Sequence, residues 1–464
     1  MLRNVLPQRS NSGPIRLPSF LCRMADQQPN LVKIASNTWW LTFEHFLRLG
    51  MGILVSIALA RYLGPEKFGF LSYAMSLASF FGAFAYMGLS GLVIRDLINH
   101  PEDKNAILGT TFALKSVGGI TAFAILAIVS ISGHTDPVEK WVILIIGLTL
   151  FFRPFETIDF WFYSQTSSKP VVLAKSISFF VTSMGKLLLV LLGATLVYFA
   201  CFSLLEAALS SFFLILTYKF SGQAVGQWKV FISKAREVLA QSWILIISGI
   251  LATVYLKIDQ IMLRWMVGPH EVGLYSVAVT FSEIWYFIPA VIATSIYPTL
   301  IDLKNRDKQQ YWQSLQKTMD ILFLFAFIVA LLLTLIGPKL ILFLYGQPYL
   351  KTGYILMIHV WAGIFIFMRG LFSKWVLIEN LLSFSLFTHG LGALTNIALN
   401  LLLIKWYAGY GAAFATLVSY AVASYFSLFF FARTRNFARI MTKSLLLPFS
   451  FILRPRITIT NTWN

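Results

Sequence analysis

The chain has 464 residues, of which 58% are hydrophobic and only 12% are Asp, Glu, Lys or Arg. A soluble domain carries about 25% charged residues, so this composition excludes a water-soluble globular protein and indicates a protein that lies in lipid. The formal net charge of +18 is of the kind that favours nucleic acid as a partner, but the placement of the charges, described below, excludes that class.

A basic N-terminal extension, residues 1–35, precedes the first apolar stretch. No acidic residue occurs in its first 25 positions, which carry Arg3, Arg9, Arg16 and Arg23. This composition is typical of a transit peptide. The alternative, which we favour, is that translation begins at Met24 and that residues 1–23 are an upstream extension.

Twelve apolar stretches follow, each long enough for a membrane-spanning helix of about 20 residues. They are residues 38–60, 68–94, 106–131, 141–163, 171–193, 194–217, 240–264, 272–297, 319–337, 353–373, 381–404 and 410–432. The apolar runs are continuous, whereas the strands of a membrane barrel alternate. The sequence therefore predicts an all-α polytopic membrane protein with about twelve transmembrane helices.

Lys and Arg concentrate in the loops on the side of the membrane that holds the N-terminus. The opposite loops hold only Arg61, Lys67, Lys140, Arg264, Lys339, Lys351 and Lys405. This asymmetry follows the positive-inside rule, so we expect an inner or plasma membrane protein with both termini in the cytoplasm. It also explains the net positive charge without nucleic acid.

The chain divides near its middle. The longest polar stretch between spans is residues 218–239, which we interpret as a cytoplasmic linker between two six-helix lobes, 36–217 and 240–433. A basic cytoplasmic tail, 434–464, follows the second lobe. Both lobes repeat one motif directly after their first span: Gly64–Ala74 and Gly268–Ala278 share Gly, Pro, Gly, Ser and Ala at the same positions. Any helical hairpin can converge on Gly-Pro, but the equivalent location favours two parallel repeats.

Charged residues inside the spans are the candidate functional residues, because a charge deep in a span costs about 2.5–3.5 kcal/mol on insertion scales. They are Glu44, Arg48, Lys115, Arg153, Glu156, Asp159, Lys186, Lys257 and Asp259, together with the lone charges Glu206, Glu283 and Arg369. We expect Arg48, Lys115, Arg153, Lys257 and Asp259 to bind substrate, since arginine and lysine suit an anionic head group. We expect Glu44, Glu156, Asp159, Lys186 and the kink at Pro154 to shape or gate the same cavity.

Structural alternatives stay open for these charges. Glu44 with Arg48 and Arg153 with Glu156 have the spacing of intrahelical ion pairs, and the sequence does not decide between pairing and substrate binding. For Lys186 we favour a side chain that extends to the membrane interface. For Lys115, which has no local partner, we favour the cavity.

The sequence predicts no catalytic residue, metal site or cofactor. The two cysteines, Cys22 and Cys201, imply no disulfide framework, and the six histidines lack metal-ligand spacing. No Walker motif is present, and no loop is long enough to form an independent catalytic domain.

Four segments occur in a characteristic order. They are Ala60–Gly69, Lys257–Met262 followed by Gly268–Tyr275, Tyr345–Tyr349, and Asn396–Asn400 followed by Gly411–Thr416. In these segments the chain resembles the polysaccharide-transport family, the Wzx-type O-antigen branch of the multidrug/oligosaccharidyl-lipid/polysaccharide exporter superfamily. The resemblance implies a MATE-like V of two six-helix bundles around a central cavity. Residues 405–408, the N-terminal extension and the tail depart from the family pattern.

The resemblance further implies alternating access and a substrate, an oligosaccharide on a polyprenyl pyrophosphate, that moves from the cytoplasmic to the outer leaflet. Membrane lipids and polysaccharide assembly machinery are the other expected partners. One alternative is a cation-coupled multidrug exporter of the same fold. Another is a membrane glycan polymerase or glycosyltransferase, which would need a catalytic loop or a nucleotide-sugar domain. The glycan, the oligomeric state and the energy source, whether proton, sodium or membrane potential, are left open.

Overall fold

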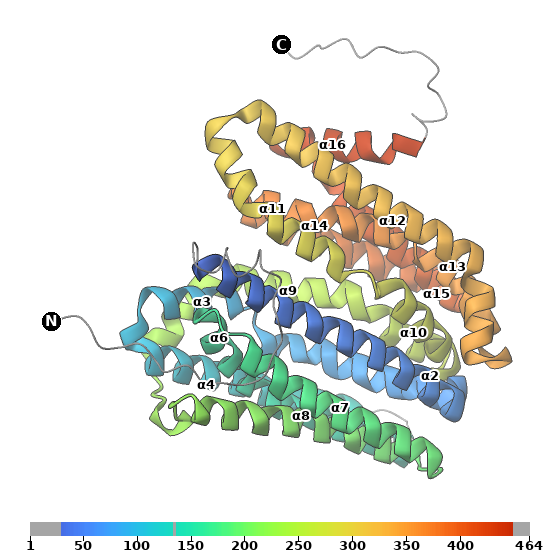
Figure 1. The fold of residues 1–464 in the computed structure, drawn as a ribbon. Coiled ribbons are helices and arrows are strands. Elements are labelled where there is room, and N and C mark those ends of the chain that lie inside the picture. The colour runs from blue at the N-terminus through green and yellow to red at the C-terminus, as the bar shows by residue number, and fades with distance from the viewer. Residues whose placement is uncertain (1–28, 133–135, 449–464) are drawn as a thin grey trace, which may run out of the picture.

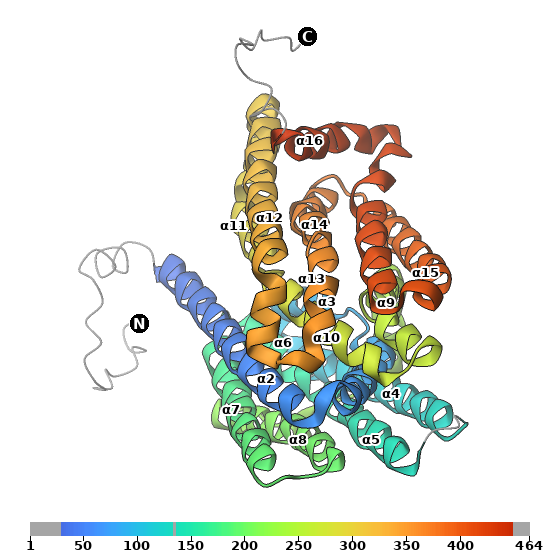
Figure 2. The ribbon, with the colours of Figure 1, turned by 90° about the vertical axis from the view of Figure 1, so that its right-hand side faces the viewer.

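The computed structural model describes residues 29–132 and 136–448, and within them the chain is helical and without strands. Most of the predicted N-terminal extension and the end of the predicted tail lie outside these residues. Figures 1 and 2 show two groups of helices, blue to green for the first half of the chain and yellow to red for the second. We call them the first and second lobes.

The first lobe contains α2 (Pro29–Tyr86), α3 (Ser90–Asn99), α4 (Lys104–Ser132), α5 (Pro137–Gly147), the 3-10 helix η2 (Leu148–Glu156), α6 (Thr157–Ser164), α7 (Lys169–Leu191) and α8 (Leu196–Phe220). The short 3-10 helices η1 (Pro101–Asp103) and η3 (Val225–Gln227) lie in its connections. The predicted linker is shorter than expected, because α9 of the second lobe already begins at Ile232.

The second lobe contains α9 (Ile232–Met266), α10 (Pro269–Glu283), α11 (Phe287–Arg306), α12 (Lys308–Tyr345), α13 (Leu350–His359), α14 (Ala362–Ile378), α15 (Leu382–Ser424) and α16 (Arg435–Leu445). The 3-10 helices η4 (Gln347–Tyr349), η5 (Phe426–Phe429) and η6 (Ala432–Thr434) connect them.

The described residues contain nine helical segments long and apolar enough to cross a membrane, and a tenth, Gln347–Ile378, is bent by 44°. Two of the nine hold two spans each. At 58 residues, α2 is much longer than a helix that crosses the roughly 30 Å of a bilayer core. It turns at Gly64 (φ 70°), which divides it into two spans. The 43-residue α15 turns at Ala408 (φ 48°). All twelve predicted stretches fall on these segments, so the predicted fold class is confirmed.

Both copies of the repeated motif form the predicted turn. Gly64 and Gly268 have positive φ angles of 70° and 131°, which L-amino acids with a side chain rarely adopt. Pro65 and Pro269 follow directly and begin the next helical stretch, where the missing N–H of proline costs nothing. The turn chemistry of the repeat is therefore the same in the two lobes.

The lobes share one hydrophobic core and also have separate ones. The shared core joins Phe70 of α2 and Leu274 of α10, beside the Gly64 and Gly268 turns. A second core lies in the second lobe around Phe323, and a third lies mainly in the first lobe around Leu108. The lobes are thus joined at the end of the molecule that holds the repeated turns.

Candidate functional site

A cavity of about 490 Å³ lies in the first lobe and is lined by residues of α2, α5, η2, α7 and α8. The charged side chains that line it are Glu44, Arg48, Arg153, Glu156, Lys175, Lys186 and Glu206. Serine and threonine residues of the same helices add hydroxyl groups to the wall. Charged groups within spans are costly and are usually functional, so this cavity is the candidate site.

One span changes from α-helix to 3-10 helix where it passes the cavity. The segment η2 runs for nine residues with Pro154 inside it, although 3-10 helices rarely exceed three or four residues. Proline removes a backbone donor and crowds the preceding turn, which disfavours a regular α-helix. Thr149, Arg153 and Glu156 of η2 face the cavity, whereas Pro154 itself is buried. Pro154 therefore lies within a departure from regular α-helix, beside the charged residues that face the cavity.

Glu156 is held between two cations. It lies 2.8 Å from Arg153 Nη1, its neighbour on the same segment, and 3.2 Å from Lys115 Nζ on α4. The Lys115 side chain is 0% exposed, whereas Arg153 is 49% exposed. Lys115 therefore does not line the cavity; it contacts a carboxylate that does. Arg153 is the cation of this group that remains open to a ligand.

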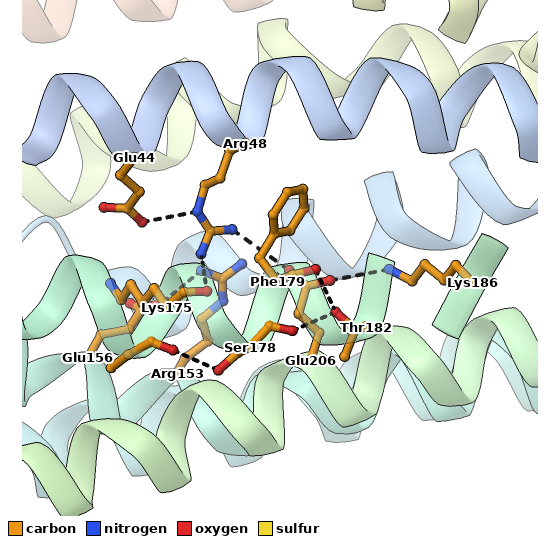
Figure 3. A network of polar contacts seen from close by, with 11 residues as sticks. Glu44, Arg48, Arg153, Glu156, Lys175, Ser178, Phe179, Thr182, Lys186 and Glu206 are labelled. Carbon is orange, nitrogen blue, oxygen red and sulfur yellow. Dashed lines mark hydrogen bonds and ion pairs between the residues drawn. The ribbon is translucent and has the colours of Figure 1, made fainter. Parts of the chain in front are cut away.

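A second chain of contacts crosses the cavity between three helices (Figure 3). Arg48 Nε on α2 lies 3.0 Å from Glu44, and Arg48 Nη1 lies 3.7 Å from Glu206 on α8. Glu206 in turn lies 3.2 Å from Lys186 Nζ on α7. Arg48 also donates to the backbone oxygen of Lys175 at 3.2 Å. Lys186 thus pairs with Glu206 inside the lobe. The sequence favours a side chain that extends to the membrane interface, and the structure does not show that arrangement.

Asp159 is not part of the cavity wall. It is buried on α6, and its carboxylate pairs with Lys175 on α7. Lys175 does line the cavity, so Asp159 is connected to the site through that lysine. The cations in or next to the cavity, Arg48, Lys115, Arg153, Lys175 and Lys186, therefore each have a carboxylate within ion-pair distance.

These contacts combine the two interpretations that the sequence left open. The pairs Glu44–Arg48 and Arg153–Glu156 exist as intrahelical ion pairs, and the same residues line the cavity. The site carries both signs of charge, so an anionic ligand has to share or exchange partners with the carboxylates already present.

The second lobe holds a different arrangement around Asp259 on α9, which is only 2% exposed. Its Oδ2 accepts hydrogen bonds from Tyr275 (2.8 Å) and Thr416 (2.5 Å), and its Oδ1 accepts one from Asn400 (2.5 Å). Asn400 also donates to Asn396 at 3.0 Å. These partners are neutral, in contrast to the ion pairs of the first lobe.

The structure therefore separates the predicted site residues into two groups. Lys257 is half-buried on α9, and neither it nor Asp259 lines the cavity of the first lobe. Among the described residues, no group of three or more His, Cys, Asp or Glu side chains is placed to hold a metal ion.

Two cavity residues, Lys175 and Glu206, were not predicted as site residues. Lys175 lies near the start of its span, where sequence reasoning assigns a lysine to the cytoplasmic boundary. Glu206 is a lone acid in its span with no local partner. The sequence offered one signal for Glu206: this lone acid and the lone lysine Lys186 occur in consecutive spans, which favours an ion pair between them.

Comparison with known proteins agrees with this architecture. The profile of a family described as "Polysaccharide biosynthesis protein" matches residues 34–304, more than half of the chain. A curated relative from Haloferax volcanii, named "Probable flippase AglR", is 28% identical over 174 residues, which are 37% of this chain and 36% of that protein. The match thus spans about a third of the relative's length.

Solved structures share the fold at low sequence identity. An inward-facing multidrug resistance MATE family transporter of the MOP superfamily aligns with a TM-score of 0.66 and 12% identity, over 86% of this chain and 96% of that one. The lipid II flippase MurJ in an inward closed conformation aligns with a TM-score of 0.65 and 17% identity, over 90% and 92%. The comparisons confirm the predicted family resemblance and the MATE-like membrane fold.

Proposed function

This chain belongs to the polysaccharide biosynthesis protein family, and we propose that it flips a polyprenyl-pyrophosphate-linked oligosaccharide from the cytoplasmic to the outer leaflet by alternating access. The family and the structural neighbours are of the transporter and flippase type. The proposal includes the predicted orientation, with both termini and the 221–231 connection on the cytoplasmic side, and docking to polysaccharide assembly machinery.

The observation that carries the proposal is the charged cavity of the first lobe. A polyprenyl tail can remain in lipid during transport, whereas a pyrophosphate and its sugars need a polar path. Arg48 and Arg153 face that path and are 33% and 49% exposed, so their guanidinium groups can reach a ligand. Arginine binds phosphate through paired donors and stays charged. The carboxylates and hydroxyls beside them suit sugar hydroxyl groups.

The remaining predicted residues take supporting roles. Lys115, which is fully buried, positions Glu156, and Asp159 positions Lys175. Lys257 supplies a cation from the second lobe. Cations on both lobes allow the charge of the substrate to stabilise a conformation in which the lobes close around it, which is what alternating access requires.

Asp259 supports a role in energy coupling. A buried carboxylate with neutral partners is costly as an anion, and a proton or a monovalent cation would neutralise it. Its location in the second lobe keeps this group apart from the cavity residues. We therefore assign Asp259 to coupling and not to direct contact with the glycan.

A cation-coupled multidrug exporter is the second candidate. The mixed charge of the cavity favours it to a degree, since the carboxylates Glu44, Glu156 and Glu206 can bind a cationic drug. The abundance of partnered cations around the same cavity favours the flippase. Transport measurements with both classes of substrate distinguish the two.

Vesicles that contain the purified full chain and a polyprenyl-pyrophosphate-linked oligosaccharide test the proposal. We expect the glycan to change leaflet, measured as its accessibility to a membrane-impermeant lectin. Arg48→Gln, Arg153→Gln and Lys257→Gln should lower the rate about ten-fold for at least two of the three, because a hydrogen bond to a charged group contributes about 1.5–3 kcal/mol.

The control is Arg306→Gln, which removes an exposed arginine that pairs with Asp302 on its own helix and does not line the cavity. Wild-type rates in all three variants would refute the cationic path. If vesicles with the wild-type chain accumulate a cationic dye while the lipid-linked glycan stays in its original leaflet, the multidrug exporter is established instead.

A further inference from the structure

The two copies of the repeated Gly-Pro motif pack against each other across the boundary between the lobes. Gly69 of α2 and Gly273 of α10 occupy the same position in their copies, five residues after Gly64 and Gly268. Each glycine faces the backbone of the proline in the other copy. We call Pro65, Gly69, Pro269 and Gly273 the glycine joint.

The approach at the joint leaves no room for a side chain. A Cβ atom at Gly69 would lie 1.9 Å from the carbonyl oxygen of Pro269, and a Cβ at Gly273 would lie 2.0 Å from that of Pro65. Both distances are far below van der Waals contact, and the opposing atoms are backbone that does not rotate away. Alanine at either position therefore requires the two helices to move apart, as small-residue contacts between membrane helices do when they are enlarged.

Polar contacts between the lobes surround the joint. Arg264 Nη2 on α9 lies 2.8 Å from Glu139 Oε2 on α5, and its guanidinium lies over the Tyr73 ring. On the other side, the Tyr349 hydroxyl donates to the backbone oxygen of Ala60 at 3.0 Å. These contacts join the two lobes at this end.

The joint also lies beside the hydrophobic core to which both lobes contribute many residues, whereas the core around Phe323 lies in the second lobe and the core around Leu108 contains Val238 of α9 among first-lobe residues. The lobes are therefore packed closely at the end with the repeated turns. A transporter that exposes its site alternately to two sides must break the contacts at this end in part of its cycle.

We infer that the glycine joint is the latch that holds the outer end of the transporter closed, and that the motif is repeated because each copy supplies one half of the latch. The inference rests on the transport function proposed above. The backbone contact makes the closed form specific to glycine, and separating the helices removes the contact without breaking any covalent or secondary structure.

Distance measurement between spin labels tests the latch directly. Labels on Lys67→Cys in the first lobe and Lys405→Cys in the second, both exposed, report the separation of the lobes when Cys22 and Cys201 are replaced by Ser. We expect wild type to show mainly the short distance. Gly69→Ala and Gly273→Ala should each shift the population about ten-fold toward the long distance, because overpacking costs about 1–3 kcal/mol.

The matched control is Gly52→Ala, in the same helix as Gly69, because a Cβ at Gly52 meets no atom within 4 Å. We expect its distances to equal those of wild type. If the two joint variants also keep wild-type distances, the latch is refuted.

A second variant keeps the test independent of folding. Glu139→Gln removes one partner of the Arg264–Glu139 ion pair without steric overlap. It should also shift the population toward the long distance, but by a smaller factor than the glycine variants. Exchange of the two residues, Glu139→Arg with Arg264→Glu, should restore the short distance. Unchanged distances in the Glu139→Gln variant would refute a role of the Arg264–Glu139 ion pair in closure.

The distance readout needs no substrate, so the two proposals fail separately. If wild type moves no lipid-linked glycan but the joint variants open, the latch stands and the flippase proposal falls. If transport is normal in wild type and in both glycine variants, the latch falls and the flippase proposal stands.

Discussion

The two lobes hold their intramembrane charges in different ways. In the first lobe, cations and carboxylates from α2, α4, η2, α7 and α8 pair with one another around an open cavity. In the second lobe, Asp259 is buried among Tyr275, Asn400 and Thr416, which are all neutral. In the first arrangement each cation has a carboxylate partner, whereas in the second the carboxylate is bonded to neutral groups.

The difference shows how each lobe can respond to a ligand. An ion pair beside a cavity can exchange its partner for a substrate group of the same sign at little net cost. A buried carboxylate with neutral donors has no partner to exchange, so a change in its charge changes the energy of its whole surroundings. The first lobe is therefore suited to substrate contact and the second to sensing a cation.

Removal of Glu156 should produce the largest effect on stability. Glu156→Gln leaves Lys115, which is fully buried, without the carboxylate that neutralises it. Breaking a buried pair by removing one partner costs about 3–5 kcal/mol. We expect a clear loss of thermal stability in detergent, measured by intrinsic fluorescence.

The double variant Lys115→Gln with Glu156→Gln should recover most of that loss, because both charges are removed together. Asp96→Asn, which removes the partner of the exposed Arg95, is the control and should change little. Equal stabilities of Glu156→Gln and Asp96→Asn would show that the first lobe does not depend on charge balance.

Replacement of Asp259 should reduce transport without a loss of stability, unlike replacement of Glu156. Asp259→Asn keeps the size and most hydrogen bonds of the side chain but removes its buried charge. We expect stability equal to or above wild type, with transport driven by an imposed ion gradient reduced about ten- to hundred-fold. Vesicle transport with and without the gradient measures this. A variant that is unstable yet still responds to the gradient would contradict the coupling role.

Exchange of Glu44 and Arg48 should have an intermediate effect. The intrahelical pair would survive the exchange, but the glutamate at position 48 would then face Glu206, which now lies 3.7 Å from Arg48. We expect the exchange to reduce transport several-fold and to lower stability by about 0.5 kcal/mol through like-charge repulsion. Wild-type transport by this variant would show that Arg48 serves only its partner within the helix.

Much of the fold could be predicted from the sequence because its signals are local. The apolar length of each span and the Gly-Pro turns at Gly64 and Gly268 depend on neighbouring residues alone. The turn at Ala408 could not be predicted, since alanine gives no indication of a positive φ. Residues 405–408, which depart from the family pattern, gave the one hint of it.

The candidate site could be predicted only in part, because ion pairs between helices depend on packing. The charges at Arg48 and Arg153 are visible as costly residues inside spans. Their partners are separated in sequence, as Arg48 is from Glu206 and Lys115 is from Glu156. No local pattern shows that these helices meet, so the sequence shows the cations but not the carboxylates of other helices that pair with them.

Removal of Lys186 should have the smallest effect, although it lines the same cavity. Its partner Glu206 lies 3.2 Å from Lys186 and also 3.7 Å from Arg48, so Lys186→Gln leaves Glu206 with a cation. We expect a stability change below about 1 kcal/mol and near wild-type transport, measured by thermal unfolding and by lectin accessibility.

Glu206→Gln is the matched comparison. It leaves Lys186 without its carboxylate partner and removes one of the two carboxylates near Arg48, the other being Glu44. It should cost more stability than Lys186→Gln, since an unpaired charge in a span is worse than an unused hydrogen-bond acceptor. If Lys186→Gln instead abolishes transport at normal abundance, Lys186 contacts the substrate itself. The balance of charge in the first lobe would then serve the ligand more than the fold.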